Sequence, residues 1–327
     1  MPTMKNYSPA EVGKFRQMLL GWFDREQRKL PWRGARDPYH ILVSEIMLQQ
    51  TRVAVVEQRY ASFVQQFPTA ERLAAAREQT VLAAWSGLGY YRRARSLHAA
   101  AKKVGGNGGF PRTAEALREL PGVGRYTAAA VASIAFDEPA AAVDGNVKRV
   151  LTRLAGRVLG ESKYWDAAQT LLDPHRPGDF NQAMMELGAT VCLPGKPLCE
   201  TCPVMALCVE QGAGVKRKQA PRNKSELRYL LEMNDGKVLL RQRPKVSSLM
   251  PGMWELPGCK ARRGPAAPLM KLKHSITNTD YTVLVFIPRK NQSLGEKDKW
   301  VTSVAAAKLA LTGLARKILQ RAEFLRC

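Results

Sequence analysis

The chain has 327 residues, of which 45% are hydrophobic and 24% charged, a composition that excludes a disordered chain and leaves room for two ordinary domains. Its formal net charge of +23 favours a polyanionic partner, with nucleic acid ahead of an anionic membrane. The sequence has no apolar run long enough to span a bilayer and no apolar signal segment near its start. We therefore expect a soluble, cytoplasmic protein.

The pattern of apolar residues predicts an all-α domain over most of the first 212 residues. One helix is expected to begin at Asp37-Pro38, because Asp caps helices and Pro is favoured in their first turn. The predicted helices of this domain include 11–27, 41–50, 129–136 and 146–156.

The character of the sequence changes after Gly212. Residues 213–226 are basic and contain Gly and Pro, which indicates a linker. Beyond it, 227–327 is predicted to form a smaller α+β domain. Its expected elements are two strands joined by Asn234-Asp235-Gly236, a strand over 281–287 and a largely helical end over 304–322.

Four of the six cysteines lie close together, at Cys192, Cys199, Cys202 and Cys208. In a reducing compartment such a group binds metal more often than it forms disulfides. The spacing C-x6-C-x2-C-x5-C leaves two candidates: structural zinc, which usually has two close pairs, and a [4Fe–4S] cluster, in which each iron takes one thiolate. One close pair with a single outlying cysteine on each side favours the cluster.

The sequence LPGVG at 120–124 predicts a helical hairpin. A helix over 113–120 is expected to end at the proline, and the two glycines allow a tight turn before the next helix. Backbone N–H groups at that helix N-terminus can hold a DNA phosphate. The alternative is an ordinary αα-hairpin, but the pattern favours phosphate binding by Gly122, Val123 and Gly124.

Two carboxylates are candidates for chemistry. Glu45 shares a predicted helix face with three apolar residues, where burial would raise its pKa and make it a general acid near neutral pH. The alternative is a glutamate whose head reaches solvent or a basic partner. Asp144 precedes a helix and could be a simple N-cap, yet beside a phosphate-binding hairpin it would face the sugar of a bound nucleotide.

The sequence GLGYY at 87–91 places two tyrosines between a glycine turn and several arginines. Such a segment can insert a ring into a base stack while the arginines hold phosphates. The alternative is that Tyr90 or Tyr91 is buried in a core and the arginines lie on a solvated face.

Taken in order, these motifs resemble those of the helix-hairpin-helix DNA glycosylases, and in particular of the adenine DNA glycosylase (MutY) family. The matching stretches are SEIMLQQT, GLGYY, LPGVGRYTA, VDGNVKRV and the four-cysteine pattern. The resemblance covers nearly the whole chain. It implies an all-α helix-hairpin-helix glycosylase domain (1–212) with one structural [4Fe–4S] cluster per chain, followed by a smaller α+β Nudix-like domain that recognises 8-oxoguanine.

The resemblance also implies a role for each site residue. Glu45 would protonate the leaving adenine at N7, and Asp144 would stabilise the oxocarbenium-like sugar through a short-lived covalent adduct, since glycoside cleavage needs two carboxylates of different pKa. The remaining implied groups are Tyr126 and Asn146, which orient the catalytic pair; Trp32, Arg33 and Gln182, around the flipped adenine; Gln50, Thr51, Leu88 and Tyr90, beside the opposite base; and Thr277 and Asn278, in the 8-oxoguanine loop.

The implied partner is double-stranded DNA with adenine opposite 8-oxoguanine or guanine, bound by a monomer that has no membrane partner. Endonuclease III-like enzymes carry a lysine where this chain has Tyr126, and only the lysine can form a Schiff base and cut the strand. A monofunctional glycosylase is therefore expected. The alternatives are an endonuclease III-like glycosylase and a non-catalytic DNA-binding iron–sulfur protein, which would need neither Glu45 nor Asp144.

The C-terminal region resembles the opening of a Nudix domain at 236–244 and 249–258. A Nudix hydrolase continues with acidic residues that hold Mg²⁺, whereas 259–271 contains none. We therefore expect this domain to bind and not to hydrolyse. The family often has a Phe-Ser-His recognition loop, and this chain has Ile276, Thr277 and Asn278 at those places.

Overall fold

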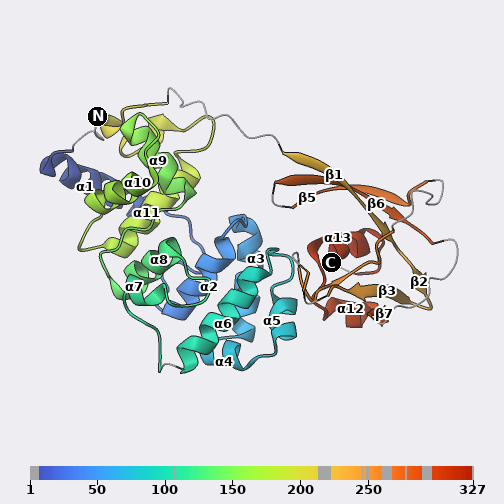
Figure 1. Ribbon diagram of the computed structural model, residues 1–327. Helices are drawn as coiled ribbons and strands as arrows, with labels where there is room; N and C mark the ends of the chain where they lie inside the picture. Colours follow the sequence, from blue (N-terminus) through green and yellow to red (C-terminus); the bar gives the residue numbers. More distant parts are fainter. Residues whose placement is uncertain are drawn as a thin grey trace. The chain divides into compact units, whose positions relative to one another are not determined.

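The computed structural model describes residues 7–106, 108–212, 222–244, 246–247, 250–259, 267–276, 278–288 and 297–325. Their contacts divide the chain into two compact units (Figure 1). Unit 1 comprises Met1–Ala75 and Ser96–Arg217, and unit 2 comprises Ala76–Arg95 and Lys218–Cys327. The second unit thus combines the C-terminal region with a short segment from the helical part of the sequence. The boundaries at 212 and 227 remain a prediction from the sequence.

The regular secondary structure that is described in unit 1 is all helical, as the sequence predicts. Its helices are α1 (Pro9–Glu26), α2 (Pro38–Leu48), α3 (Val53–Gln66), α4 (Ala70–Ala75), α6 (Arg92–Gly106, whose first turn belongs to unit 2), α7 (Ala114–Leu117), α8 (Arg125–Phe136), α9 (Gly145–Ala155), α10 (Glu161–Leu171) and α11 (Pro177–Thr190), followed by the 3-10 turns η1 (Cys199–Thr201) and η2 (Met205–Leu207). No described helix is long and apolar enough to cross a membrane.

Local side-chain caps fix where several of these helices begin. Ser8 and Glu11 form a reciprocal capping box at the start of α1. Asp37 accepts a hydrogen bond from the His40 N–H and caps α2, and Asp144 caps α9 in the same way through the Val147 N–H. Asp144 is therefore a helix N-cap, which is one of the two interpretations of its sequence position. The cap hydrogen bond fixes its backbone at the start of α9.

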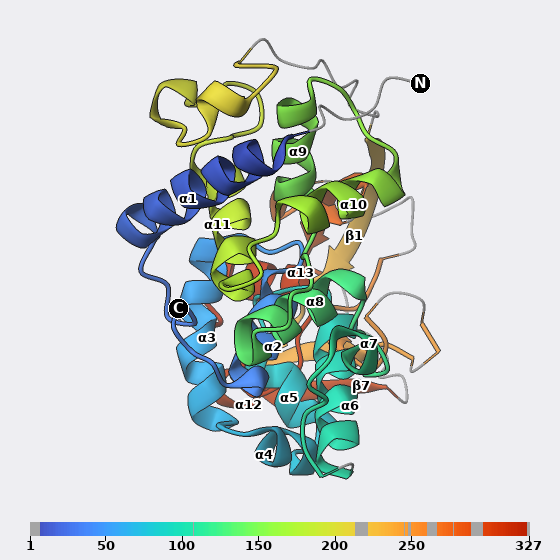
Figure 2. The ribbon, with the colours of Figure 1, turned by 90° about the vertical axis from the view of Figure 1, so that its left-hand side faces the viewer.

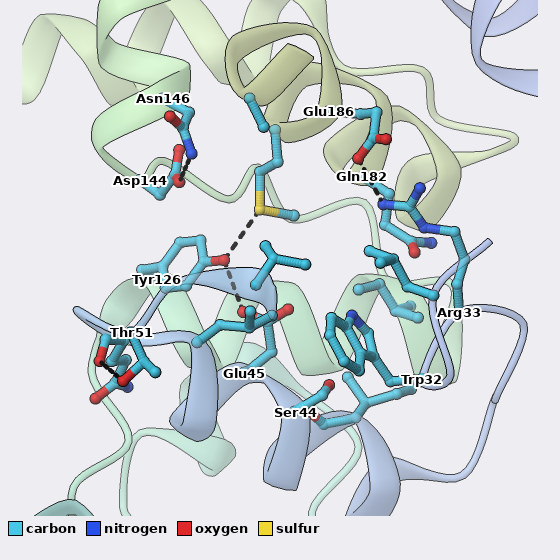
Figure 3. A pocket seen from close by; sticks show the side chains of 18 of the residues that line it. Trp32, Arg33, Ser44, Glu45, Thr51, Tyr126, Asp144, Asn146, Gln182 and Glu186 are labelled. Carbon is cyan, nitrogen blue, oxygen red and sulfur yellow. Dashed lines mark hydrogen bonds and ion pairs between the residues drawn. The ribbon is translucent and has the colours of Figure 1, made fainter. Parts of the chain in front are cut away.

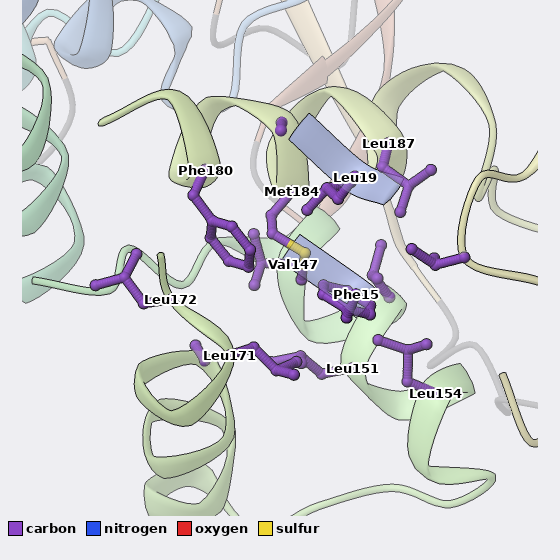
Figure 4. Close-up of a cluster of buried hydrophobic side chains, with 14 of the residues drawn as sticks. Phe15, Leu19, Val147, Leu151, Leu154, Leu171, Leu172, Phe180, Met184 and Leu187 are labelled. Atoms are coloured by element: carbon purple, nitrogen blue, oxygen red, sulfur yellow. The ribbon is translucent and has the colours of Figure 1, made fainter. Parts of the chain in front are cut away.

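The core of unit 1 lies around α11, which packs against α1, α8 and α9, while α1 also contacts α10 (Figure 2). Figure 4 shows the buried side chains that meet there, among them Phe15, Leu19, Leu151, Phe180 and Met184. Each such side chain stabilises the fold by about 1.5–3 kcal/mol through removal of apolar surface from water. This packing holds the ends of α8, α9 and α11 in fixed positions.

The predicted hairpin joins α7 to α8 and needs glycine at one position in particular. Gly122 has a φ of +77°, and a Cβ there would lie 2.3 Å from the Cβ of Ser96. No residue with a side chain fits without displacing α6. Gly124 is the N-cap of α8 and Val123 is buried, so the backbone of the turn leads directly into the N-terminus of that helix.

Unit 2 has the α+β composition that the sequence predicts. It contains α5 (Glu78–Ala84), β1 (Asn223–Leu230), β2 (Met233–Asn234), β3 (Lys237–Gln242), β4 (Trp254–Glu255), β5 (Met270–Ile276), β6 (Thr279–Phe286), β7 (Asp298–Thr302), α12 (Ser303–Ala307) and α13 (Gly313–Arg321). One sheet has the order β1-β6-β5 with β1 parallel to β6, and the other pairs β3 with β2, β4 and β7 in antiparallel fashion.

Two turns of unit 2 bear on the predictions. The hairpin between β2 and β3 is confirmed, with Asp235 and Gly236 at φ values of +48° and +69°, as a type I′ turn requires.

The β5–β6 turn contains Asn278, whose carbonyl accepts from the Asn223 N–H at 3.0 Å. Thr277 lies outside the described residues, as do 213–221 of the expected linker. β1 begins within that expected linker, because β6 offers it a parallel partner from Thr279 onward.

Candidate active site

A cavity of about 340 Å³ opens among the helices of unit 1 (Figure 3). Its volume falls within the range of small-ligand sites. The predicted site residues that line it are Trp32, Arg33, Glu45, Gln50, Thr51, Tyr126, Asp144, Asn146 and Gln182, together with Arg28, Ser44, Gln49, Met185 and Glu186, which the sequence analysis did not single out.

Glu45 lies on α2 with only 7% of its surface exposed. The Tyr126 hydroxyl, from α8, donates to its Oε2 at 2.6 Å and also contacts the sulfur of Met185 at 3.0 Å (Figure 3). Burial raises the pKa of Glu45 to about 7; the Tyr126 hydrogen bond opposes this shift and the nearby Asp144 charge adds to it. Glu45 can therefore hold a proton near neutral pH, as a general acid must.

Asp144 reaches the same cavity from the start of α9. Its Oδ1 accepts from the Val147 N–H at 2.7 Å, and its Oδ2 accepts from the Asn146 side chain at 2.9 Å. Burial raises its pKa, while these two donors and the charge of Arg149 favour the ionised form. The two carboxylates thus occupy one cavity in different surroundings, with a phenol on Glu45 and amide donors on Asp144.

Glu186 is a third carboxylate of the cavity, and its side chain is 1% exposed. It accepts from Arg28 Nε at 2.7 Å and from Arg33 at 3.0 Å. Burial raises its pKa, but the hydrogen bonds from the two arginines outweigh burial and lower the pKa to about 2. Glu186 follows Gln182 by one helical turn on α11, so a search for polar residues at i+4 from Gln182 would have found it.

The side chains predicted around a flipped base occupy one wall of the cavity (Figure 3). Trp32 is buried and packs edge-on against Tyr60, with ring centroids 5.5 Å apart. The Arg33 guanidinium lies over the Phe23 ring at 5.1 Å. Its Nε atom is buried and has no hydrogen-bond partner in the part of the chain that the structure describes, so it remains available as a donor.

The residues predicted beside the opposite base divide between the two units. Gln50 and Thr51 line the cavity of unit 1, and Gln50 has a φ of +56°, a strained conformation for a residue with a side chain. Leu88 and Tyr90 belong to unit 2. Leu88 is buried, whereas Tyr90 is 41% exposed with a φ of +46°. Gly122, Val123, Gly124 and Asn278 do not line the cavity.

The four cysteines lie beside the core of unit 1. Cys192, Cys202 and Cys208 pack against it, and Arg153 Nη1 lies 3.2 Å from the sulfur of Cys192. Burial, together with the charges of the other three thiols nearby, raises the pKa of Cys202 to about 11. Among the described residues, no three His, Cys, Asp or Glu side chains are arranged to hold a single metal ion.

A hydrogen-bonded path joins the cysteine region to the cavity. Arg149 Nε donates to the Cys192 carbonyl at 2.8 Å, and its Nη2 donates to Asn146 Oδ1 at 2.7 Å and to the Gly188 carbonyl at 2.6 Å. Asn146 in turn donates to Asp144. One arginine therefore fixes the orientation of the amide that contacts the catalytic candidate Asp144.

Comparisons with known proteins identify the family of the chain. Residues 43–163 match the family described as "HhH-GPD superfamily base excision DNA repair protein". The adenine DNA glycosylase of Rattus norvegicus is 52% identical over 220 residues, and that of Arabidopsis thaliana is 38% identical over 304 residues. The chain belongs to the HhH-GPD superfamily, within the adenine DNA glycosylase family. The two matches cover 61% and 77% of this chain but only 42% and 48% of the relatives, so the chain spans less than half their length.

Solved structures support this family and its helical fold. A thermostable thymine-DNA glycosylase is 33% identical with a TM-score of 0.58, and the match covers 63% of this chain and all of that one. An endonuclease III in a non-covalent complex with DNA is 25% identical with a TM-score of 0.54, over 63% of this chain and 97% of that one. The adenine DNA glycosylase family assignment thus rests on sequence identity, and the fold is shared with a thymine-DNA glycosylase and an endonuclease III.

Proposed function

We propose that this chain is a monofunctional adenine DNA glycosylase, which hydrolyses the N-glycosidic bond of adenine opposite 8-oxoguanine or guanine in duplex DNA. The observation that carries the proposal is a buried, protonatable Glu45 in the same cavity as Asp144, in a chain of the adenine DNA glycosylase family. A non-catalytic DNA-binding protein has no need for two such carboxylates. The net charge of +23 supports binding to the phosphate backbone.

The chemistry divides between the two carboxylates. Glu45 gives its proton to N7 of the extruded adenine, so the base leaves as a neutral molecule when the C1′–N9 bond breaks. Asp144, whose ionised form is favoured by the hydrogen bonds from Val147 and Asn146, stabilises the positive charge that develops on the sugar and forms a short-lived bond to C1′. Water then attacks C1′ and gives a proton to the ionised Glu45 while the bond from C1′ to Asp144 breaks, which leaves an abasic site, an ionised Asp144 and a protonated Glu45. Opposite tasks for two carboxyl groups are the general pattern of glycoside hydrolysis.

Recognition of the base is assigned to the wall formed by Trp32, Arg33, Gln182 and Glu186. The Gln182 amide offers both a donor and an acceptor, and Arg33 Nε is a buried donor without a partner among the described residues. Hydrogen bonds of this kind reject a wrong base because buried groups are then left unpaired. The Arg28–Glu186–Arg33 group keeps Arg33 in place.

Recognition of the opposite base is assigned to Gln50, Thr51, Leu88 and Tyr90 and to the C-terminal region. The latter is proposed to be Nudix-like and to bind 8-oxoguanine, with Asn278 in its β5–β6 turn as the described candidate contact. Its sequence over 259–271 has no acidic residue to hold Mg²⁺, which supports a binding role rather than hydrolysis.

A [4Fe–4S] cluster on Cys192, Cys199, Cys202 and Cys208 is part of the proposal. The donor set fits, because four thiols lie near one another and Arg153 stabilises the thiolate form of Cys192 through its charge. Each iron of the cluster takes one thiolate. The cluster would tie the cysteine loop to the C-terminal end of α9, where Arg153 contacts Cys192 and Cys208, without taking part in the chemistry.

The cluster predicts a brown protein with about four irons and four acid-labile sulfides per chain, by the stoichiometry of the cubane. Cys199→Ser should lower the iron content and the yield of soluble protein, because the loop loses one of its attachments. Iron and sulfide analysis with visible absorption checks this. A colourless protein with one zinc per chain would contradict it, and Cys259→Ser is the control, since Cys259 lies outside the group.

The proposed function is tested by single-turnover assays on four duplexes. We expect adenine release from adenine:8-oxoguanine and, more slowly, from adenine:guanine, with no release from adenine:thymine or of thymine from thymine:guanine. Strand cleavage should require later alkali or heat, and borohydride should trap no adduct, because Tyr126 cannot form a Schiff base. Thymine release would point to the activity named for the thymine-DNA glycosylase, and a trapped adduct would point to a lyase.

A further inference from the structure

The turn between α5 and α6, at residues 85–91, belongs to the same compact unit as the C-terminal strands. We call it the wedge turn, because it carries Leu88 and Tyr90, which are proposed to lie beside the opposite base. The C-terminal region therefore has direct contacts to a segment of the opposite-base machinery that is far away in the sequence.

The wedge turn has a demanding backbone. Gly87 and Gly89 have φ values of +97° and +69°, and Tyr90 joins them at +46°. Glycine adopts a positive φ readily, but a tyrosine in this conformation is strained and persists only where its surroundings hold it. Two contacts come from nearby in the sequence: Trp85 Nε1 donates to the Gly89 carbonyl at 3.1 Å, and Arg93 donates to the Leu88 and Gly89 carbonyls at 2.9 and 3.2 Å.

Further contacts come from the C-terminal region. The Tyr91 hydroxyl donates to the Leu311 carbonyl at 2.9 Å, and Arg316 Nε donates to Ser86 Oγ at 2.7 Å. Tyr91 and Ser86 are both buried, so these bonds are shielded from water. Arg95, just beyond the turn, donates to the Pro251 carbonyl at 2.6 Å.

The partners on the C-terminal side are themselves fixed by a sheet. The Trp254 N–H of β4 donates to the Ala310 carbonyl, and the Thr312 N–H donates back to the Trp254 carbonyl, at 2.9 and 2.8 Å. These bonds hold Leu311 at the start of α13, one turn before Arg316. The wedge turn thus contacts a segment between α12 and α13 that is hydrogen-bonded to β4.

We propose that Arg316 and Tyr91 are positioning residues, which hold the wedge turn in the conformation that inserts beside the opposite base. This inference rests on the proposed function for the role of Leu88 and Tyr90, and it gives the C-terminal region a second route to opposite-base recognition besides the β5–β6 turn. Arg316 acts through Ser86, and Tyr91 acts through the turn backbone; neither needs to touch DNA.

The test uses the full-length protein and the variants Arg316→Met, Arg316→Lys and Tyr91→Phe. Lys317→Met is the matched control, because it removes a cation from the next position of α13, where Lys317 is half-buried and donates to the Lys273 carbonyl, outside the wedge turn. Hydrogen exchange reports on the amides of residues 86–91 in the free protein. A duplex with 2-aminopurine beside the guanine opposite adenine reports, by its fluorescence, on unstacking when the protein is bound at saturation.

Arg316→Met and Tyr91→Phe are expected to raise amide exchange in the wedge turn roughly tenfold, the effect of one lost hydrogen bond on an opening equilibrium. They should also reduce the fluorescence increase on binding, while Arg316→Lys keeps most of it and Lys317→Met all of it. A purely structural role would raise exchange throughout unit 2 and leave the saturated fluorescence unchanged, which would overturn the proposal.

Two further outcomes are decisive. Tyr91→Phe removes one hydroxyl and keeps the ring. If its amide exchange and fluorescence equal those of the unchanged protein, the proposal is rejected, even if Arg316→Met fails to fold. If the unchanged protein released no adenine but the variants lost the fluorescence increase, the proposed function would fail and the positioning role would stand.

Discussion

Glu45→Gln is expected to lower the single-turnover rate of adenine release by about 10²–10⁴-fold, the usual contribution of a general acid, while duplex affinity stays nearly unchanged. Glutamine keeps the shape of Glu45 and can still accept the Tyr126 hydrogen bond of 2.6 Å, but it has no proton to give to N7. Single-turnover excision and a binding titration on the same adenine:8-oxoguanine duplex measure the two effects separately.

The raised pKa of Glu45 predicts how the rate of adenine release changes with pH. The pKa of Glu45 is raised to about 7, and the protonated form is the acid, so the rate should fall as the pH rises through 7. Toward acid pH the rate should fall again as Asp144 is protonated, because its carboxylate is needed ionised. In Glu45→Gln the fall on the alkaline side should disappear from the residual rate.

Glu45→Gln should raise the stability of the fold at alkaline pH, although it lowers the rate of adenine release. The pKa of Glu45 is about 7 in the folded state and near its ordinary value of 4.5 in the unfolded state. The folded state therefore binds more protons between these values, and its stability falls as the pH rises from 4.5 to 7. Glu45→Gln removes this loss, so the variant should be more stable than the unchanged protein at pH 8.

The control for this variant is Glu26→Gln, which makes the same substitution at an exposed position of α1. It should leave both rate and stability unchanged. A rate for Glu45→Gln close to that of the unchanged protein, with folded protein and normal binding, would reject Glu45 as the general acid.

Asp144→Asn is expected to lower the rate of adenine release by at least about 10²–10³-fold, the effect of removing one group that stabilises developing charge. Asparagine caps helices as well as aspartate does, so the Val147 N–H at 2.7 Å keeps its acceptor and α9 keeps its start. The substitution therefore removes the negative charge and leaves the backbone in place. Single-turnover assays measure the expected loss of rate, and circular dichroism at matched temperatures checks that the helical fold is unchanged.

The chain offers a matched control for this change as well. Asp37 caps α2 as Asp144 caps α9, through an acceptor bond from the His40 N–H, and it does not line the cavity. Asp37→Asn should leave the excision rate unchanged. If both aspartates lost activity to the same degree, the effect of Asp144→Asn would be attributable to helix capping and its catalytic role would be discarded.

The sequence by itself determined the features that depend on near neighbours in the chain. Asp37 and Pro38 start a helix because the cap and the fixed φ act within one turn, and the Asp235-Gly236 turn forms because both residues tolerate a positive φ. Gly122 is likewise required by its own backbone angle. Such interactions are encoded within a few residues, so a pattern in the sequence is enough to predict them.

Only the tertiary structure decided which groups face each other and how strongly each is buried. The pKa of Glu45 depends on Tyr126 and Asp144, which follow it by 81 and 99 residues. The two arginines on Glu186 are even more remote from it in the chain, by 158 and 153 residues. The inclusion of residues 76–95 in the C-terminal unit arises in the same way. Burial and long-range hydrogen bonds exist only once the helices and strands have packed, and they set the charge state of each group in the cavity.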